Sequence, residues 1–330
     1  MKRQTVHRDL WSIVLAGGEG ERIRPLTERW LGSHRPKQYC TFVGTRSLFQ
    51  HTLDRTDLLT SPDNKVILIG NTHYKEASTQ LLGRSAGKLV LQPSNRDTGP
   101  GIFLPLTYVR ARDPEALVAI CPSDHFVYPE PRFIEVIWDA AVAAGQLEDR
   151  VILLGARPDR PETEYGWIHP GSKIPCDGNS QLRAVESFLE KPEFAEAGEA
   201  LAAGAYWNTF VVVASVRTLW SLGWRCLPEM MPLFECLDRA IGTSGETTVL
   251  ESIYRVMPSR NFCIDLLQRV PEQVAVLPLT GVLWCDWGRP ERITESLRAI
   301  GKQPAFSPEI LAGVKTPEAR APRVMHATMN

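Results

Sequence analysis

Residues 10–38 read LWSIVLAGGEGERIRPLTERWLGSHRPKQ, and this stretch decides the fold of the chain. It opens with a short apolar run, Leu10 to Ala16, which is typical of a buried strand. Three glycines follow the run: Gly17, Gly18 and Gly20. Without a Cβ, the backbone can turn sharply and approach a ligand closely. Three basic residues come next: Arg22, Arg24 and Lys37. Cations beside exposed backbone N–H groups suit a phosphate chain, so we expect a phosphate-binding loop here.

A Gly-Gly-x-Gly turn after a strand is a weak signal when it stands alone. This one lacks the Gly-Lys-Ser/Thr ending of a P-loop, and its glycines miss the G-x-G-x-x-G spacing of dinucleotide-binding folds. The longer string is far more specific. It reads Leu15-Ala-Gly-Gly-x-Gly-x-Arg22-x-x-Pro25-Leu26-Thr27 and continues with Pro36-Lys37-Gln38. In this order and spacing it resembles the opening motif of the sugar-1-phosphate nucleotidylyltransferases.

The resemblance implies how this stretch works. The glycine loop would wrap the triphosphate of an NTP, Arg22 would contact the phosphates and Lys37 would lie beside the reacting group. It also implies an α/β fold with a Rossmann-like, doubly wound and mostly parallel sheet, as in the GT-A-like nucleotide-diphospho-sugar transferases. On this basis the nucleotide-binding residues of the loop are Leu15, Ala16, Gly17, Gly18, Gly20 and Glu21.

Composition narrows the class of protein. The 330 residues are 43% hydrophobic, which suits a globular chain with a substantial core. The formal net charge is −1, so nucleic acid and anionic membranes are not expected as partners. We see no secretory signal and no apolar segment of membrane-spanning length, and we expect a cytoplasmic protein. The seven cysteines are scattered without a C-x-x-C pair, which favours reduced thiols over a zinc site.

The first half of the chain alternates short apolar runs with helical patterns. The predicted strands are residues 10–16, 65–70, 88–92, 116–121 and 150–156. The predicted helices are residues 47–55, 73–82, 101–111 and 132–145. This alternation is typical of an open, largely parallel sheet with helices on both faces. Ligands of such sheets bind at the carboxyl ends of the strands, which is where the glycine loop falls.

The sequence changes character after residue 156. Short strands at 166–169, 182–190 and 206–214, with a helix at 193–203, indicate an inserted antiparallel layer covering the sheet. A strand at 273–279 and a closing helix at 290–300 complete the domain. We therefore expect one domain over residues 8–300, with a nucleotide-binding half at 10–155 and a sugar-binding half at 156–300. Residues 301–330 contain several prolines and are expected to form a partly disordered extension.

Two aspartates follow apolar runs. Asp124 lies in Cys121-Pro-Ser-Asp-His125, and Asp286 lies in Leu283-Trp-Cys-Asp-Trp-Gly288. A lone aspartate after a strand is more often a turn or capping residue. However, both motifs resemble the metal-binding motifs of mannose-1-phosphate guanylyltransferases, which implies that Asp124 and Asp286 hold Mg²⁺ against phosphate oxygens and water. One departure follows Gly288, where Arg-Pro replaces the Ser-Trp that is common in the family.

The stretch from Gln92 to Gly101 reads QPSNRDTGPG. It resembles the Asn/Arg-Asn-Thr-Ala-Pro-Ala loop of the guanylyltransferases, which shapes the nucleotide pocket. The resemblance implies that Asn95 and Thr98 bind the nucleotide together with Asp124, although Thr98 can equally cap the helix that follows. Glycine replaces both alanines here, and Gln92 stands where the family often has Glu.

A third set of motifs resembles the sugar side of the same family. Glu164-Tyr-Gly-Trp-Ile168 is similar to Tyr-Gly-Tyr/Trp-Ile, residues 190–192 match Glu-Lys-Pro, and residues 207–209 are similar to Trp-Asn-Ser/Thr. The implied sugar-binding residues are Gly166, Glu190, Lys191 and Asn208. Carboxylate and amide groups suit sugar hydroxyls, and a lysine suits the sugar phosphate. Phe210 departs from the family glycine and can narrow the sugar pocket.

Over residues 8–300 the motifs follow the order of the mannose-1-phosphate guanylyltransferases. The reaction implied by this resemblance converts GTP and mannose 1-phosphate into GDP-mannose and pyrophosphate, with Arg22, Lys37 and Lys191 as catalytic residues. Two alternatives stay open. One is the same chemistry with another NTP or another hexose or heptose 1-phosphate, and the other is a catalytically silent homologue that binds nucleotide sugar as a regulator. A homodimer is expected from the family alone.

Overall fold

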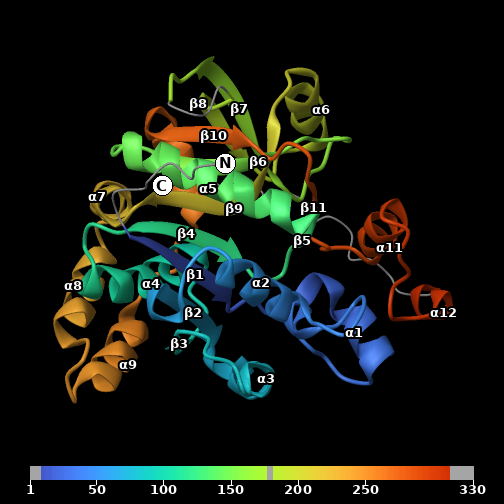
Figure 1. The fold of residues 1–330 in the computed structure, drawn as a ribbon. Helices are drawn as coiled ribbons and strands as arrows, with labels where there is room; N and C mark the ends of the chain where they lie inside the picture. Colours follow the sequence, from blue (N-terminus) through green and yellow to red (C-terminus); the bar gives the residue numbers. More distant parts are fainter. Residues whose placement is uncertain (1–8, 177–180, 313–330) are drawn as a thin grey trace, which may run out of the picture.

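The computed structural model describes residues 9–176 and 181–312. These residues form a nine-stranded sheet with helices on both faces and a separate two-stranded sheet (Figure 1). The strand order of the large sheet is β3-β2-β1-β4-β9-β6-β10-β8-β7, and β7 also pairs with β9. Its strands are β1 (Leu10–Ala16), β2 (Lys65–Gly70), β3 (Lys88–Gln92), β4 (Leu117–Pro122), β6 (Val151–Ala156), β7 (Gly166–Lys173), β8 (Arg183–Glu190), β9 (Tyr206–Ser215) and β10 (Val274–Pro278).

The half of the sheet that holds the glycine loop is parallel. Strand β1 pairs in parallel with β2 on one side and β4 on the other, and β2 pairs in parallel with β3. The predicted bounds of β1, β2 and β3 are confirmed to the residue, and those of β4 and β6 to within one residue. Buried runs rich in Val, Ile and Leu form such strands because both faces of the sheet are covered. The α/β class is therefore confirmed.

The antiparallel strands lie elsewhere than expected. They do not form a layer over the sheet but continue it: β9 lies between β4 and β6 and is antiparallel to both, while β7 and β8 lie at the far edge. The reason lies in β9, where Val211, Val212 and Val213 are all buried. A strand that is apolar on both faces belongs inside a covered sheet rather than on top of one.

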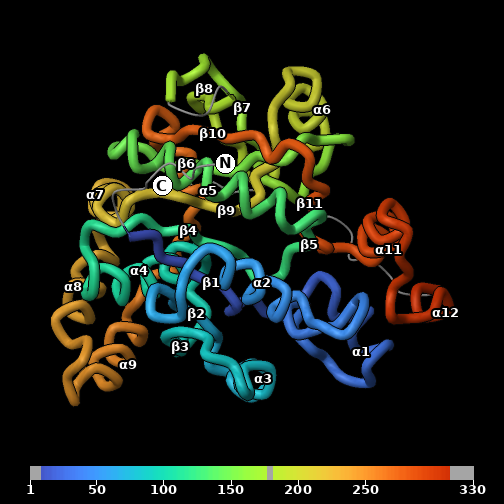
Figure 2. Tube along the Cα trace, viewed as in Figure 1, coloured from blue at the N-terminus to red at the C-terminus, as the bar shows by residue number. Residues whose placement is uncertain are grey.

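Helices cover both faces, as Figure 2 also shows. The alternation within β1 decides this, because Trp11 and Ile13 pack into one core, whereas Val14 and Ala16 pack into another. One face carries α4 (Thr98–Arg112), α7 (Val216–Cys226), α8 (Met231–Ala240) and α9 (Glu246–Val256). The other carries α2 (Leu48–Asp57), α3 (Tyr74–Leu81), α5 (Glu130–Gln146) and α6 (Phe194–Ala202).

The end of the described chain packs beside the start. Helices α11 (Pro290–Ala299) and α12 (Pro308–Leu311) lie near α1 (Arg24–Leu31) in Figure 1. Phe306 is buried and meets the ring of Trp30, with the centroids 5.4 Å apart. The prediction of a partly disordered extension stays open, since an aromatic anchor fixes only the first part, residues 301–312. For residues 313–330 it falls outside the described part of the chain.

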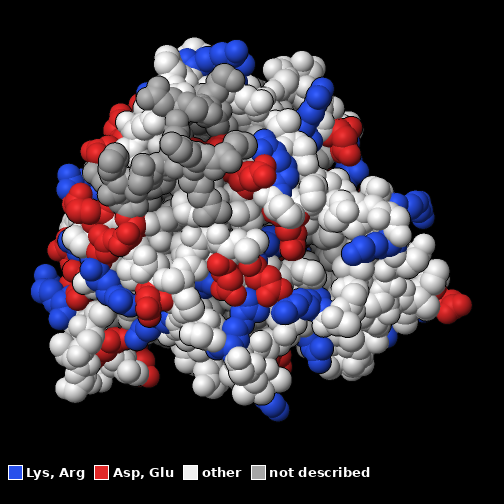
Figure 3. Space-filling model, viewed as in Figure 1, with Lys and Arg blue, Asp and Glu red and all other residues white. Residues whose placement is uncertain are grey.

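The surface offers no single dominant charge on the face shown in Figure 3, where acidic and basic side chains are interspersed. This distribution agrees with the balanced composition. Within the described residues, the helices are all too short or too polar to span a bilayer.

Candidate active site

Two adjoining cavities open at the carboxyl ends of β1 and β4. The first, called the central cavity below, has a volume of about 340 Å³. The second, the loop cavity, has a volume of about 540 Å³ and shares Leu15, Gly17, Gly18 and Thr98 with the first. Predicted site residues that line the central cavity are Leu15, Gly17, Gly18, Arg22, Thr98, Asp124, Gly166, Glu190, Lys191, Asn208 and Asp286. Asn95 lines the loop cavity.

The glycine loop divides into residues that face the cavities and residues that shape the turn. Gly20 adopts φ 68°, and a Cβ there would lie 2.8 Å from the backbone nitrogen of Lys37, so only glycine fits. Ala16 is buried, and its carbonyl accepts a hydrogen bond from Tyr39. Glu21 lies on the exposed side of the loop and pairs with Arg24. Of the six predicted loop residues, Ala16, Gly20 and Glu21 therefore lie outside the lining of either cavity.

Lys37 joins the two aspartate motifs. It is buried, and its Nζ lies 2.9 Å from Oδ2 of Asp124. The same ammonium donates to the backbone carbonyl of Asp286. Three motifs that are far apart in the sequence thus meet at one buried cation, as the sequence predicts for strand ends at one edge of a sheet.

Asp286 is the most heavily bonded acid of the site. Its Oδ1 accepts from the Tyr165 hydroxyl at 2.6 Å, from Arg292 at 2.9 Å and from the Gly288 N–H at 2.9 Å. Its Oδ2 accepts from Arg22 at 2.7 Å. Glycine at 288 leaves room for this contact, because a Cβ would lie 2.5 Å from the Arg22 guanidinium and 2.6 Å from Oδ2.

Electrostatics keep both aspartates ionised. Burial alone would raise the pKa of Asp286, but Lys37, Arg22 and Arg292 outweigh it and hold that pKa well below the usual range. Burial likewise opposes ionisation of Asp124, and Lys37 again lowers its pKa overall. The carboxylate of Asp286 opposes this effect and raises the pKa of Asp124. The site is therefore a close pair of negative charges held by basic residues.

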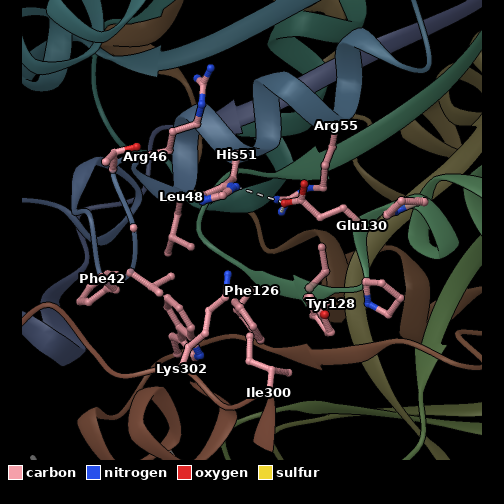
Figure 4. Close-up of a pocket in the computed structure, with 17 residues that line it drawn as sticks. Phe42, Arg46, Leu48, His51, Arg55, Phe126, Tyr128, Glu130, Ile300 and Lys302 are labelled. Atoms are coloured by element: carbon pink, nitrogen blue, oxygen red, sulfur yellow. Dashed lines mark hydrogen bonds and ion pairs between the residues drawn. The ribbon is translucent and has the colours of Figure 1, made fainter. Parts of the chain in front are cut away.

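Aromatic rings pack beside the two turns that carry the aspartates. Strands β5 (Phe126–Tyr128) and β11 (Leu283–Cys285) pair antiparallel next to Asp124 and Asp286. The Phe126 and Trp287 rings stack at 4.6 Å and form part of the wall of another cavity, of about 590 Å³ (Figure 4). The stack fixes each aspartate through its chain neighbours, and β5 is an element that the sequence analysis missed.

The sugar-side motifs line the same central cavity. In the β7–β8 ladder Gly166 is paired with Glu190, whose carboxylate would lie 2.9 Å from a Cβ at position 166. Lys191 is exposed and lies 3.3 Å from Glu190. Asn208 on β9 is buried and donates to the Cys263 sulfur. The four predicted residues are thus brought together, with Lys191 free to move.

Backbone strain is concentrated at the same place. Within the described residues, positive φ at a non-glycine residue occurs at Asp97, Lys191, Phe210 and Trp287. Three of these line the central cavity and the fourth follows Asp286. Such conformations cost about 1–3 kcal/mol each and persist where the surroundings impose them, which is common at functional sites. Phe210 is notable because the resembled family has glycine there, the residue that this conformation favours.

The chemistry of the donor set fits a magnesium ion. Mg²⁺ is usually bound by one or two carboxylates together with water and phosphate oxygens. Asp124 and Asp286 supply two ionised carboxylates, and the Asp124 side chain is 36% exposed, so phosphate oxygens can reach it. The described residues contain no group of three or more His, Cys, Asp or Glu side chains placed for a metal ion. A cation completed by substrate and water needs no such group.

Some residues of the site escaped the sequence analysis. Arg292 is buried and binds Asp286, yet it lies six positions beyond the aspartate and outside the motif. Tyr165 and Glu164 stand within a recognised motif but received no role. Glu162 binds Arg292 as well. Asp286 and Arg292 lie on either side of the start of a helix, at a spacing that allows them to pair. This spacing predicts a contact only when the other buried partners of Arg292 are known.

A glycine-rich turn after the first strand, at the carboxyl edge of a covered sheet and beside basic side chains, defines the class of α/β proteins built around a phosphate-binding loop. Within that class, the chain belongs to the nucleotidyl transferase family, whose family model matches residues 11–303.

Relatives support the assignment at moderate similarity. The Escherichia coli protein named mannose-1-phosphate guanylyltransferase is 30% identical over 271 residues, which cover 81% of this chain and 56% of that protein. The xanthan biosynthesis protein XanB of Xanthomonas campestris is 32% identical over 204 residues, covering 61% and 41%. The chain spans about half the length of the curated relatives it matches.

Solved structures resemble the fold closely. A Thermus thermophilus structure described as mannose-1-phosphate geranyltransferase has a TM-score of 0.74 at 28% identity, covering 87% of this chain and 79% of that one. A Helicobacter pylori structure described as mannose-6-phosphate isomerase has a TM-score of 0.67 at 20% identity, over 84% of this chain and 99% of that one. The second likeness concerns the fold alone.

Proposed function

We propose that this chain is a sugar-1-phosphate nucleotidylyltransferase that makes GDP-mannose and pyrophosphate from GTP and mannose 1-phosphate. The observation that carries the proposal is the contact of Lys37 with Asp124 and Asp286, two aspartates that line one cavity together with Lys191 and Asn208. A triphosphate and a sugar phosphate are both polyanions, and this cavity is lined by basic side chains from two separate motifs. The names of the relatives agree with the substrates.

The proposed reaction is an in-line displacement at the α-phosphorus. A sugar-phosphate oxygen forms the new P–O bond, the bond to pyrophosphate breaks, and no covalent enzyme intermediate is needed. Such transfers depend on positioning and on charge neutralisation. Arg22 and Lys37 stabilise charge on the triphosphate and the leaving pyrophosphate, while Lys191 orients the nucleophilic phosphate. Asp124 and Asp286 would hold Mg²⁺, which supplies further neutralisation when bound.

The identity of the sugar is the least constrained part of the proposal. Phe210 lines both cavities and packs against Phe262, with the centroids 6.3 Å apart. A ring in the place of a family glycine narrows the space beside Asn208. This observation favours, as the second candidate, the same chemistry with a different hexose or heptose 1-phosphate.

The test is pyrophosphate release with Mg²⁺ over a grid of four NTPs and several sugar 1-phosphates. A peak at GTP with mannose 1-phosphate supports the proposal, and a peak elsewhere keeps the chemistry and changes the substrate. If no pair of substrates releases pyrophosphate although nucleotide still binds, the result contradicts catalysis and favours the regulatory homologue. Asp124→Asn should abolish the signal, whereas the matched control Asp159→Asn, at an exposed acid, should leave it intact.

A further inference from the structure

Arg292 on α11 is a buried guanidinium that contacts four side chains. One nitrogen, Nη1, donates to Oδ1 of Asp286 at 2.9 Å and to the Tyr165 hydroxyl at 3.1 Å. The other, Nη2, donates to the carboxylates of Glu162 at 2.5 Å and Glu164 at 2.9 Å. Only 4% of the side chain is exposed, and the guanidinium lies 4.8 Å from the centre of the Tyr165 ring. Both terminal nitrogens of the guanidinium are thus occupied by the protein itself.

The two carboxylate oxygens of Asp286 differ in how many hydrogen bonds they accept. Oδ1 accepts three hydrogen bonds, all from buried or backbone donors: Tyr165, Arg292 and the Gly288 N–H. A carboxylate oxygen has about two lone-pair sites, so Oδ1 has no capacity left for a ligand. Oδ2 accepts one hydrogen bond, from Arg22.

Arg22 differs from Arg292 in how firmly it is held. Its side chain is 47% exposed, it lines the central cavity, and it bonds to Asp286 Oδ2 at 2.7 Å and to Glu164 at 3.3 Å. Both partners have other basic neighbours, since Arg292 also binds Asp286 and Glu164. Arg22 can therefore leave without exposing an unpaired buried acid, whereas loss of Arg292 would also remove the close partner of Glu162.

We propose that Arg292 is a positioning residue that anchors Oδ1 of Asp286 and so presents Oδ2 to the ligand, and that Arg22 covers Oδ2 until a phosphate group draws it away. The consequence is an order of events. In the substrate-free protein Asp286 is screened from cations, and the arrival of the triphosphate both recruits Arg22 and uncovers the second carboxylate. The inference rests on the proposed function in taking the ligand to be a triphosphate. The different hydrogen bonding of Oδ1 and Oδ2 does not depend on that function.

The test is the affinity of the substrate-free protein for Mn²⁺, used as a probe for the cation and followed by electron paramagnetic resonance. Removing a nearby positive charge should by itself strengthen cation binding. The proposal makes a sharper claim, because two arginines on the same carboxylate should respond with opposite signs. The matched control is Arg289→Gln, since Arg289 bonds to Glu164 Oε1 at 2.8 Å rather than to Asp286.

We expect Arg22→Gln to tighten Mn²⁺ binding by about fivefold, and by more than Arg289→Gln, because it uncovers Oδ2 as well as removing charge. Added to the Arg22→Gln protein, in which Oδ2 is uncovered, Arg292→Gln should weaken Mn²⁺ binding by about 10-fold or more, as loss of a residue that orients a metal ligand commonly does. Arg292→Gln should also lower kcat while leaving the KM for the nucleotide close to its original value.

Tyr165→Phe supplies an independent check if Arg292→Gln fails to fold, because it removes one donor to Oδ1 and retains the arginine. Introduced into the Arg22→Gln protein, in which Oδ2 is uncovered, it should weaken Mn²⁺ binding about threefold. Tighter or unchanged binding when Arg292→Gln is added to Arg22→Gln, or when Tyr165→Phe is added because the Arg292→Gln protein does not fold, would overturn the role of Arg292. If Arg22→Gln and Arg289→Gln changed the Mn²⁺ affinity equally, the proposal that Arg22 covers Oδ2 would be overturned. These readouts stand even if the protein releases no pyrophosphate, so failure of the inference and failure of the proposed function are distinguishable.

Discussion

Two sets of side chains line the central cavity, one around Asp286 and one around Lys191, called the Asp286 wall and the Lys191 wall below, and they differ in how many protein partners they have. On the Asp286 wall every charge has a protein partner, and the acid itself is bonded by Arg22, Arg292 and Tyr165. On the Lys191 wall the ammonium is 60% exposed and has one nearby acid, Glu190. The difference indicates that one wall is built by folding, whereas the other is completed by the ligand. Mutations on the two walls should therefore separate stability from activity.

The largest effect should come from the complete wall. Asp286→Asn leaves Arg292 and Lys37 beside a neutral amide, and breaking one side of a buried ion network costs about 3–5 kcal/mol. Loss of the charge should also lower kcat by about 10³-fold, a typical result of removing a preorganised electrostatic group. Chemical denaturation and pyrophosphate release measure the two effects. A variant as stable and active as the original would contradict the description of this wall.

Lys191→Ala tests the open wall. Because the side chain is exposed, we expect the free energy of unfolding to stay within about 0.5 kcal/mol of the original value. The loss of a phosphate partner should lower kcat/KM for the sugar phosphate by about 10²-fold, which corresponds to about 2.7 kcal/mol. Lys173→Ala, at another exposed lysine, is the control. A large loss of stability at Lys191 would erase the contrast between the walls.

Phe210→Gly should sharpen the comparison at the boundary between the two cavities. Glycine at φ 57° relieves strain worth about 1 kcal/mol and so offsets part of the lost packing against Phe262. We expect a net change in stability of less than about 2 kcal/mol, together with a relative gain of about 10-fold for bulkier sugar 1-phosphates. An unchanged substrate profile would show that the ring does not limit the sugar.

The smallest predicted effect is a pH dependence. The folded-state pKa of Asp286 lies below its unfolded value of about 3.9, so its ionised form stabilises the fold. That contribution is fully present above about pH 4 and is lost as the pH falls through the lower, folded-state pKa. Unfolding titrations between pH 6 and 3 should therefore show a steeper loss of stability in the original protein than in Asp286→Asn. Parallel curves of stability against pH for the two proteins would contradict the lowered pKa of Asp286.

Local patterns predicted the fold where they were sufficient. The run from Leu10 to Ala16 and the glycines after it gave the first strand and its loop, because apolar burial and turn geometry are encoded within a few residues. The place of β9 was not predictable in this way. Its pairing with β4 and β6 depends on which edges are vacant after the parallel strands assemble, and no local period reports that.

Local patterns likewise predicted only some residues of the candidate site. Motifs named Asp124 and Asp286, and the structure brings both to Lys37. Arg292 could not be assigned from sequence, because an arginine near the start of a helix is ordinary until the buried acids around it are known. Glu21 was assigned by its place in a motif, but its side chain turns to the exposed Arg24. Residues that act through several distant partners are those that a pattern along the chain does not reveal.

The most direct test of the account follows the nucleotide itself, using GTP labelled at the α-phosphorus with Mg²⁺, with and without mannose 1-phosphate. Direct attack by the sugar phosphate predicts labelled GDP-sugar and pyrophosphate in equal amounts, and neither product nor labelled protein when the sugar phosphate is left out. Pyrophosphate release without the sugar phosphate, or label retained on the protein, would contradict direct transfer between the two walls of the cavity.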